Sequence, residues 1–316
     1  MKPHRELPSK GGSCLNTSSF NKRHHGWRNI AAAGLALTVA LSGQTAFADG
    51  KRTFAVERAV NVQAEQPTTD KRQSEVKPNK KVAIIIDDFG NGQGGTEEML
   101  SMPIKLTVAI MPFLPTSKTD AELAHKRGYD VIVHMPMEPK QGNPKWLGPG
   151  AITSNMTDEE VRKRVEEAID NVPYAVGMNN HMGSKITGDE RIMSVVLEVC
   201  RERGLFFVDS KTNYHSIVGK LAVQMGMPPV ANNIFLDDQH TISHISRQMK
   251  AVETWANEHQ NCVTIGHVGV QGKKTAEAIR QSISGMQNSV SFVGIGDLVR
   301  DTWDWKPSPI VPSNNN

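Results

Sequence analysis

Acidic residues and histidines stand at the points where the apolar runs of this sequence end. The run at residues 82–86 leads directly into Asp87 and Asp88 and then into the glycine-rich stretch GNGQGG. Two adjacent carboxylates repel each other, and both are costly to desolvate unless a cation or a hydrogen-bond donor compensates them. The pair therefore indicates a divalent cation that is bound by one carboxylate while the other stays free as a base.

Four further apolar runs end in the same way. Their polar residues are His134 and Glu138 in VIVHMPMEP; Asn179, Asn180 and His181 in VGMNNHMGS; Asp209, Ser210 and Lys211 in FFVDSKT; and His267 in VTIGHV. Any one of them has a simpler explanation as a helix cap or a hydrogen-bonded structural residue. Their joint placement favours a metal site, because the carboxyl ends of barrel strands meet at one mouth, where active sites are built. A set of Asp and His ligands suits zinc or a similar first-row metal better than calcium.

The elements that must position these residues are short strands that alternate with helices. The eight apolar runs are continuous rather than alternating, as expected of strands buried on both faces; they cover residues 81–87, 106–112, 130–136, 174–180, 205–210, 232–237, 262–268 and 291–296. Amphipathic helical patterns at residues 157–172, 189–204 and 244–259 lie between them. This order predicts a parallel α/β sheet that is closed or nearly closed into a barrel, with an open doubly wound sheet as the alternative.

The two ends of the chain differ from this pattern. Basic residues, a 12-residue apolar run and the sequence Ala46-Phe47-Ala48 predict a secretory signal peptide at residues 1–48, cleaved before Asp49. The apolar run is short for a membrane anchor, which needs roughly 18 residues or more. Residues 49–80 show no apolar periodicity and predict a flexible tether, residues 81–300 form the predicted folded domain, and residues 301–316 a disordered tail. The protein is therefore expected in the periplasm or outside the cell, with no membrane span after cleavage.

Charge and cysteine content narrow the function further. The whole chain carries a net charge of +3, and the predicted signal peptide alone carries +5, which leaves −2 on the mature part. No basic patch argues for a nucleic-acid partner. Cys200 and Cys262 remain after cleavage, and they either form a disulfide or are two buried free thiols.

The ordered series IDDFG, HMPMEP, NNHMGS, FVDSKT and IGHV resembles the divergent polysaccharide deacetylases, which are distant relatives of the NodB-type carbohydrate esterases. The resemblance covers about residues 81–299. It implies a distorted seven-stranded (β/α) barrel and a metal-dependent hydrolase of N-acetyl groups on glycans. By this resemblance, Asp87 is the catalytic base, Asp88 and His134 bind the metal, and His267 is the general acid.

One departure from the family pattern concerns the third metal ligand. Typical deacetylases have a second histidine where this sequence has Glu138, four residues after His134. His181 is therefore expected to supply the missing ligand, with Glu138 as its rival or as a partner that supports the site. Glu138, Asn180, Asp209, Ser210 and Lys211 are expected to contact the substrate, or the last three to tune His267.

The predicted reaction is hydrolysis of an amide, with Zn²⁺ as the expected metal and an envelope glycan as the expected substrate. An esterase or phosphoesterase with the same metal is one alternative. A periplasmic glycan-binding or regulatory module with a vestigial site is another, although the intact Asp87, Asp88 and His267 argue against it.

Overall fold

The structure is a computed structural model that describes residues 79–306. The predicted signal peptide, nearly all of the predicted tether and most of the predicted tail therefore lie outside the described residues. The elements are β1 (Lys81–Phe89), α1 (Thr96–Leu100), β2 (Thr107–Ile110), α2 (Ser117–Lys126), β3 (Asp130–Met137), η1 (Pro144–Trp146), α3 (Asp158–Asn171), β4 (Ala175–Met182), η2 (Ile186–Gly188), α4 (Glu190–Glu202), β5 (Phe206–Asp209), α5 (Val218–Gln224), β6 (Val230–Ala231), β7 (Ile234–Phe235), α6 (Ile242–His259), β8 (Asn261–His267), α7 (Gly272–Met286), β9 (Ser291–Val293) and α8 (Ile295–Trp303).

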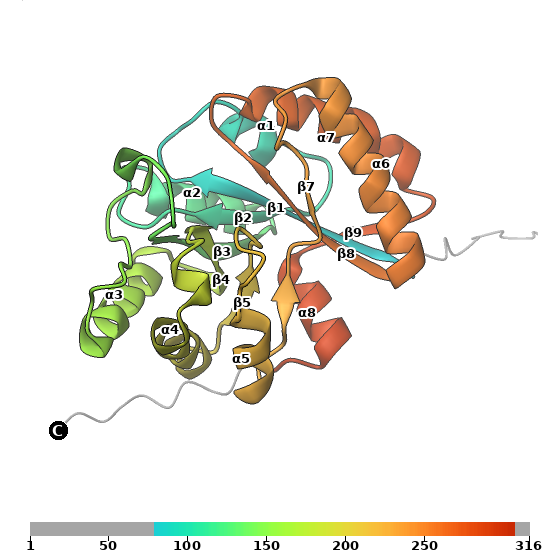
Figure 1. The fold of residues 1–316 in the computed structure, drawn as a ribbon. Helices are drawn as coiled ribbons and strands as arrows, with labels where there is room; N and C mark the ends of the chain where they lie inside the picture. The colour runs from blue at the N-terminus through green and yellow to red at the C-terminus, as the bar shows by residue number, and fades with distance from the viewer. Residues whose placement is uncertain (1–78, 307–316) are drawn as a thin grey trace, which may run out of the picture. The chain divides into compact units, whose positions relative to one another are not determined.

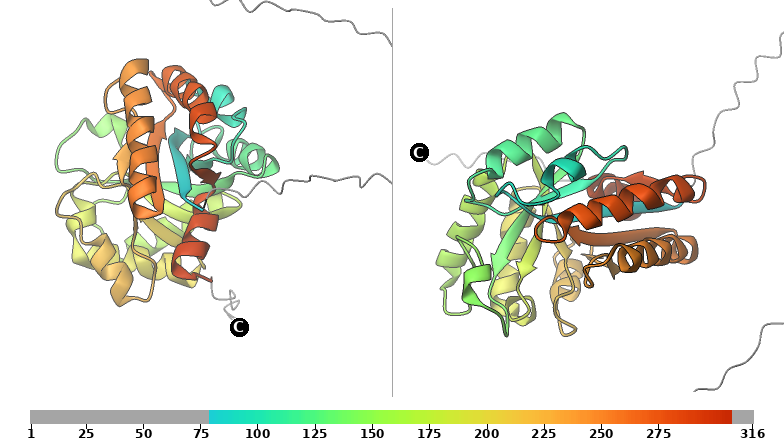
Figure 2. Two further views of the ribbon diagram at one scale, coloured as in Figure 1. Left: turned by 90° about the vertical axis from the view of Figure 1, so that its right-hand side faces the viewer. Right: turned by 90° about the horizontal axis from the view of Figure 1, so that it is seen from above.

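The strands form one parallel sheet with helices around its outer side (Figures 1 and 2). Within the described residues the sheet has nine strands in the order β6-β5-β4-β3-β2-β1-β8-β7, and β9 pairs with β1 beside this path. The two ends of the path, β6 and β7, follow each other in the chain but do not pair with each other. The prediction of a distorted parallel barrel is confirmed, and its strand number of seven is approximate because β6 and β7 are two residues long.

Both faces of the strands are apolar, which explains the continuous runs in the sequence. In β1, Val82, Ile84 and Ile86 belong to a large cluster that also contains the buried side chains of the surrounding helices. The alternate residues Ala83 and Ile85 belong to a second, smaller cluster with inward residues of the neighbouring strands. This alternation has period two, so it decides which polar residues at the strand ends face the interior of the barrel.

The last helix differs from the predicted end of the domain. The run at residues 291–296 was expected to be one strand, but β9 ends at Val293 and α8 begins at Ile295. Helix α8 continues to Trp303, past the predicted boundary at residue 300. Its buried residues Ile295, Leu298 and Val299 pack into the second, inner cluster.

Two further expectations can be compared with the described residues. Cys200 and Cys262 are buried free thiols, so the disulfide alternative is wrong for this structure. Within residues 79–306, no helix combines the length and the apolar character that crossing a bilayer requires. Thr157 and Glu160 form a capping box at the start of α3.

Candidate metal centre

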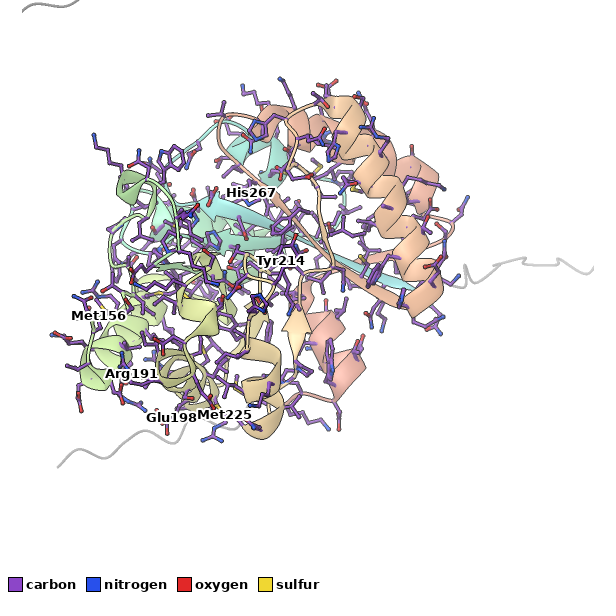
Figure 3. All side chains as sticks on the ribbon, viewed as in Figure 1. Met156, Arg191, Glu198, Tyr214, Met225 and His267 are labelled. Carbon is purple, nitrogen blue, oxygen red and sulfur yellow. The ribbon has the colours of Figure 1, made fainter. Side chains whose placement is uncertain are left out.

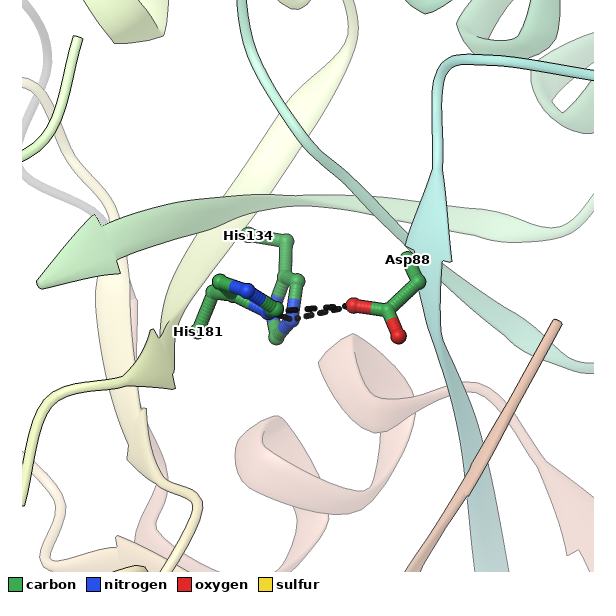
Figure 4. A group of neighbouring side chains, drawn as sticks. All are labelled: Asp88, His134 and His181. Carbon is green, nitrogen blue, oxygen red and sulfur yellow. Dashed lines mark hydrogen bonds and ion pairs between the residues drawn. The ribbon is translucent and has the colours of Figure 1, made fainter. Parts of the chain in front are cut away.

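Three side chains from three strands meet at the carboxyl end of the barrel. They are Asp88 at the end of β1, His134 in β3 and His181 in β4 (Figure 4). The Oδ1 atom of Asp88 lies 3.3 Å from Nε2 of His134 and 3.0 Å from Nδ1 of His181. The two ring nitrogens are 3.1 Å from each other. The three atoms therefore form one compact triangle.

Strand alternation places His134 on the inner face with Ile132. The register of β3 with β4 sets Asn179 beside His134 and His181 beside Pro136, so these two residues face inward as well. Asp87 shares the parity of Ile85, but Asp88 has the opposite parity. The backbone resolves this conflict: Asp88 has a φ of 70°, and the pairing of β1 with β2 shifts between Ile86 and Phe89. A left-handed residue at a strand irregularity re-aims its side chain. Both carboxylates of the pair therefore serve the same mouth.

Hydrogen bonds on the far side of each imidazole fix the nitrogen that faces the triangle. Nε2 of His181 lies 2.9 Å from the carbonyl oxygen of Trp146, which can only accept, so Nε2 carries the proton. Nδ1 of His134 lies 2.7 Å from Oδ1 of Asn179, whose amide nitrogen donates to Asp87 Oδ1 at 2.9 Å. The nitrogen that remains on each ring, Nε2 of His134 and Nδ1 of His181, is therefore the one available to bind a metal beside Asp88.

This arrangement fits a divalent metal. Three atoms with free lone pairs repel each other at 3.0–3.3 Å unless a cation lies among them. Asp88 Oδ1 is buried and makes no hydrogen bond of good geometry, so its contacts with the two rings are electrostatic rather than directional. A tetrahedral zinc site with bonds of about 2.0–2.2 Å places its ligand atoms about 3.3–3.6 Å apart, close to the spacing found here.

Charges within the site set the protonation of its ligands. Burial would raise the pKa of Asp88, but the neighbouring His134 and His181 hold it well below its usual value. Burial would lower the pKa of His134, yet the charges of Asp87 and Asp88 raise it. Without a metal, a proton on a ring nitrogen takes the place of the cation, so metal binding is expected to release protons.

Asp87 lies beside the triangle rather than in it. Its Oδ1 accepts the hydrogen bond from Asn179 and lies 3.7 Å from Nδ1 of His134. Burial raises the pKa of Asp87, and the charges of His134 and His267 offset this only in part. A buried carboxylate with a raised pKa is suited to accept a proton near neutral pH.

His267 ends β8, and its backbone pairs with Asp87 across β1 and β8. Its ring nitrogen Nδ1 donates to Asp237 Oδ1 at 2.8 Å, and its backbone N–H donates to Asp237 Oδ2 at 2.9 Å. Burial would lower the pKa of His267, but the Asp237 hydrogen bond and the nearby carboxylates raise it to about 9. The ring is therefore protonated at neutral pH and can donate a proton through Nε2. Figure 3 labels His267 among the side chains of the described residues.

The glycine-rich stretch after Asp88 packs against the loop that follows His267. Gly269 N–H donates to the carbonyl oxygen of Gly94 at 2.8 Å. A Cβ atom on Gly272 would lie only 2.1 Å from the same oxygen. The loop that follows Asp87 thus rests directly on the loop that follows His267, and this contact needs glycine.

Several residues that are predicted to contact the substrate make hydrogen bonds that support the loops. Asn180 and Asp209 have the parity of the outer face. Asn180 accepts a hydrogen bond from Ser210 N–H at 3.0 Å, donates to the carbonyl oxygen of Met182 at 2.7 Å, and is 1% exposed. Ser210 Oγ donates to the carbonyl oxygen of Asn180, and Asp209 accepts hydrogen bonds from Lys211 N–H and Ser216 Oγ. These three residues therefore support the loops, and their contact with a substrate stays a prediction.

Two further expectations are revised by the contacts. The residue that holds His267 is Asp237, whereas Lys211 Nζ pairs with Asp209 at 3.2 Å, so the expectation that residues 209–211 tune His267 is wrong. Glu138 lies outside the triangle; it pairs with Lys185 at 2.6 Å and accepts Ser154 N–H at 2.7 Å. These two contacts lower the pKa of Glu138 to about 2. Of the two rivals for the third ligand, the geometry places His181 in the cluster.

Comparison with known proteins gives the family. The model of the divergent polysaccharide deacetylase family matches residues 84–299. The chain belongs to this family. It is 32% identical over 231 residues to an uncharacterized protein of Haemophilus influenzae, covering 73% of this chain and 81% of the relative. It is 30% identical over 221 residues to the uncharacterized protein YibQ of Escherichia coli, covering 70% of this chain and 68% of YibQ.

A solved structure supports the fold of this divergent polysaccharide deacetylase. The crystal structure of an uncharacterized protein from Agrobacterium tumefaciens C58 superposes with a TM-score of 0.65 at 19% identity. The match covers 70% of this chain and 90% of the other. At this identity the likeness concerns the fold alone.

Proposed function

We propose that this protein is an exported, metal-dependent hydrolase that removes N-acetyl groups from an envelope glycan. The observation that carries the proposal is the triangle of Asp88, His134 and His181, in which each imidazole turns toward Asp88 the nitrogen that its outward hydrogen bond leaves available. Asp87 and His267 on its flanks provide a proton acceptor and a proton donor. Membership of the divergent polysaccharide deacetylase family supports a carbohydrate as the substrate.

The proposed metal is Zn²⁺, because two imidazoles and one carboxylate are typical catalytic zinc ligands. When bound, such a metal supplies Lewis acidity, which polarises a carbonyl group and lowers the pKa of water. The remaining chemistry belongs to side chains of this chain. Asp87 Oδ2 accepts the proton that the attacking water loses, while Asn179 holds Asp87 Oδ1 in place. His267 gives its Nε2 proton to the nitrogen of the leaving amine, and Asp237 stabilises the cationic ring before this transfer.

Acetate release tests the reaction. Purified protein is loaded with Zn²⁺ and incubated with N-acetylated envelope glycan fragments, and His134→Ala serves as the metal-free control. We expect acetate from the wild type and none from the variant. Release of another acyl group or of phosphate would point to the esterase or phosphoesterase. Tight glycan binding without any release would leave the glycan-binding module as the function.

Export is a separate part of the proposal. The basic residues, the apolar run and Ala46-Phe47-Ala48 support cleavage before Asp49. Intact-mass measurement on periplasmic material should give a mature chain that begins at Asp49. Recovery of the chain in the membrane fraction with residues 30–48 retained would show an anchor instead.

A further inference from the structure

The loop between β3 and α3 presents an aromatic side chain that the proposed reaction does not use. Trp146, in the short helix η1, is 68% exposed. The carbonyl oxygen of the same residue accepts the hydrogen bond from His181 Nε2 at 2.9 Å. The exposed indole therefore lies within one side-chain length of a metal-binding histidine. A large aromatic side chain left in solvent beside a catalytic centre indicates a contact surface for a ligand.

The same loop also forms a pocket of about 480 Å³, a size typical of ligand sites. Its lining includes Glu138, Lys140, Gln141, Asn143, Leu147 and Asn155. Trp146 lies between Asn143 and Leu147 in the sequence, and the backbone N–H of Trp146 donates to the carbonyl oxygen of Asn143 at 3.0 Å. Amide side chains both donate and accept hydrogen bonds, as sugar hydroxyl and acetamido groups require.

Contacts at both ends hold this loop in place. Ser154 N–H and Lys185 Nζ both bind the carboxylate of Glu138, at 2.7 and 2.6 Å. The backbone of Ile152 exchanges hydrogen bonds with Pro136 and Glu138 at the end of β3. Since Glu138 is ionised and paired with Lys185, the pocket offers no unpaired negative charge from this residue. A surface that is ordered before binding loses less conformational entropy when a ligand arrives.

We propose that Trp146 and the adjoining pocket form a subsite for the pyranose unit next to the sugar that reacts. The apolar face of a pyranose ring stacks on the indole, and the amide side chains bind its hydroxyl and acetamido groups. The inference rests on the proposed function and specifies its substrate class: a glycan of several N-acetylhexosamine units rather than a monosaccharide. The carbonyl oxygen of Trp146 sets the subsite directly beside His181 and so couples glycan placement to the metal centre.

Calorimetric binding of the N-acetylglucosamine tetramer tests this subsite. The zinc-loaded protein carries Asp87→Asn in every sample, so that turnover does not disturb the measurement. We expect Trp146→Ala to weaken tetramer binding about tenfold, which corresponds to about 1.4 kcal/mol of lost stacking. Trp146→Phe keeps an aromatic face and should retain most of the affinity, whereas Trp146→Leu should not.

A matched control is Trp303→Ala. Trp303 is 36% exposed and lies in α8, two residues after Asp301. Asp301 pairs with Lys81 at the amino end of β1, which is the end opposite the metal centre. This variant should bind the tetramer like its parent.

Three results would overturn the proposal: no tetramer binding by the parent, parental affinity in Trp146→Ala, or equal losses in Trp146→Phe and Trp146→Leu. A loss of zinc from Trp146→Ala would also overturn it, because the effect would then pass through His181. These readouts do not depend on acetate release. A protein that binds the tetramer through Trp146 but never releases acetate would contradict the proposed function and leave the subsite intact.

Discussion

Replacing Asp237 by Asn should move the pH dependence of turnover, because this carboxylate holds the proposed general acid. Asp237 Oδ1 accepts the proton of His267 Nδ1, and Oδ2 accepts from His267 N–H and from Thr275 Oγ1. In Asp237→Asn the amide oxygen can still accept the last two hydrogen bonds. The amide nitrogen then faces Nδ1 and donates to it, which favours the neutral ring and removes the charge that stabilised the cation.

The size and sign of the effect follow from the pKa of His267, which is raised to about 9. A general acid must be protonated, so wild-type turnover should fall as the pH rises through about 9. Loss of Asp237 lowers the pKa of His267 toward its ordinary value of 6.5, while the charges of Asp87 and Asp88 keep part of the increase. About nine-tenths of the wild-type ring is protonated at pH 8, and most of this protonated fraction is lost in the variant as the pKa of His267 falls toward its ordinary value.

The assay is kcat/KM for acetate release between about pH 6 and pH 10, on samples of equal zinc content. Asp237→Asn should lose on the order of tenfold in activity between its own plateau at low pH and pH 8, while the wild type should stay nearly flat over that range. Thr275→Val is the matched control, since it removes one hydrogen bond to Asp237 but leaves the carboxylate in place. An alkaline limb that stays at the wild-type pH in Asp237→Asn would refute the assignment of His267 as general acid.

Three further tests concern separate parts of the site. Asp87→Asn should retain zinc and lose about 10²–10⁴-fold in turnover, since it removes only a base; zinc loss equal to that of Asp88→Asn would contradict this. Glu138→Ala should weaken zinc binding far less than His181→Ala, and elemental analysis that gave the reverse order would show the wrong third ligand. Gly272→Ala places a Cβ atom 2.1 Å from a carbonyl oxygen of the glycine-rich loop, so kcat should fall with little change in zinc content; wild-type kcat would show that this loop contact does not position the acid and the base.

Much of the barrel and its mouth could be predicted from the sequence because the responsible signals are local. Strands buried on both faces need continuous apolar runs, and the polar residues that end those runs must gather where parallel strands end. The structure brings Asp88, His134 and His181 together in this way. The position of Asp88 in this cluster depends on its φ of 70°. A positive φ is usually marked in a sequence by glycine, and here the residue is an aspartate.

The role of Asp237 could not be predicted from the sequence because it depends on a contact with a residue distant in the chain. Asp237 ends the apolar run NNIFLD, just as Asp87 ends the run before it. This position could have identified Asp237 as a residue at the mouth of the barrel. Its partner His267 is 30 residues away, and only the pairing of β7 with β8 brings them together. Helix α8 had a local signal in the helical spacing of Ile295, Leu298 and Val299, hidden by the apolar run before it.

Anomalous scattering at the zinc absorption edge, measured on crystals grown with Zn²⁺, would locate the metal. We expect one strong peak within about 2.0–2.2 Å of Asp88 Oδ1, His134 Nε2 and His181 Nδ1. A peak that involves Glu138 in place of His181, or no peak at this triangle in zinc-saturated crystals, would contradict this expectation.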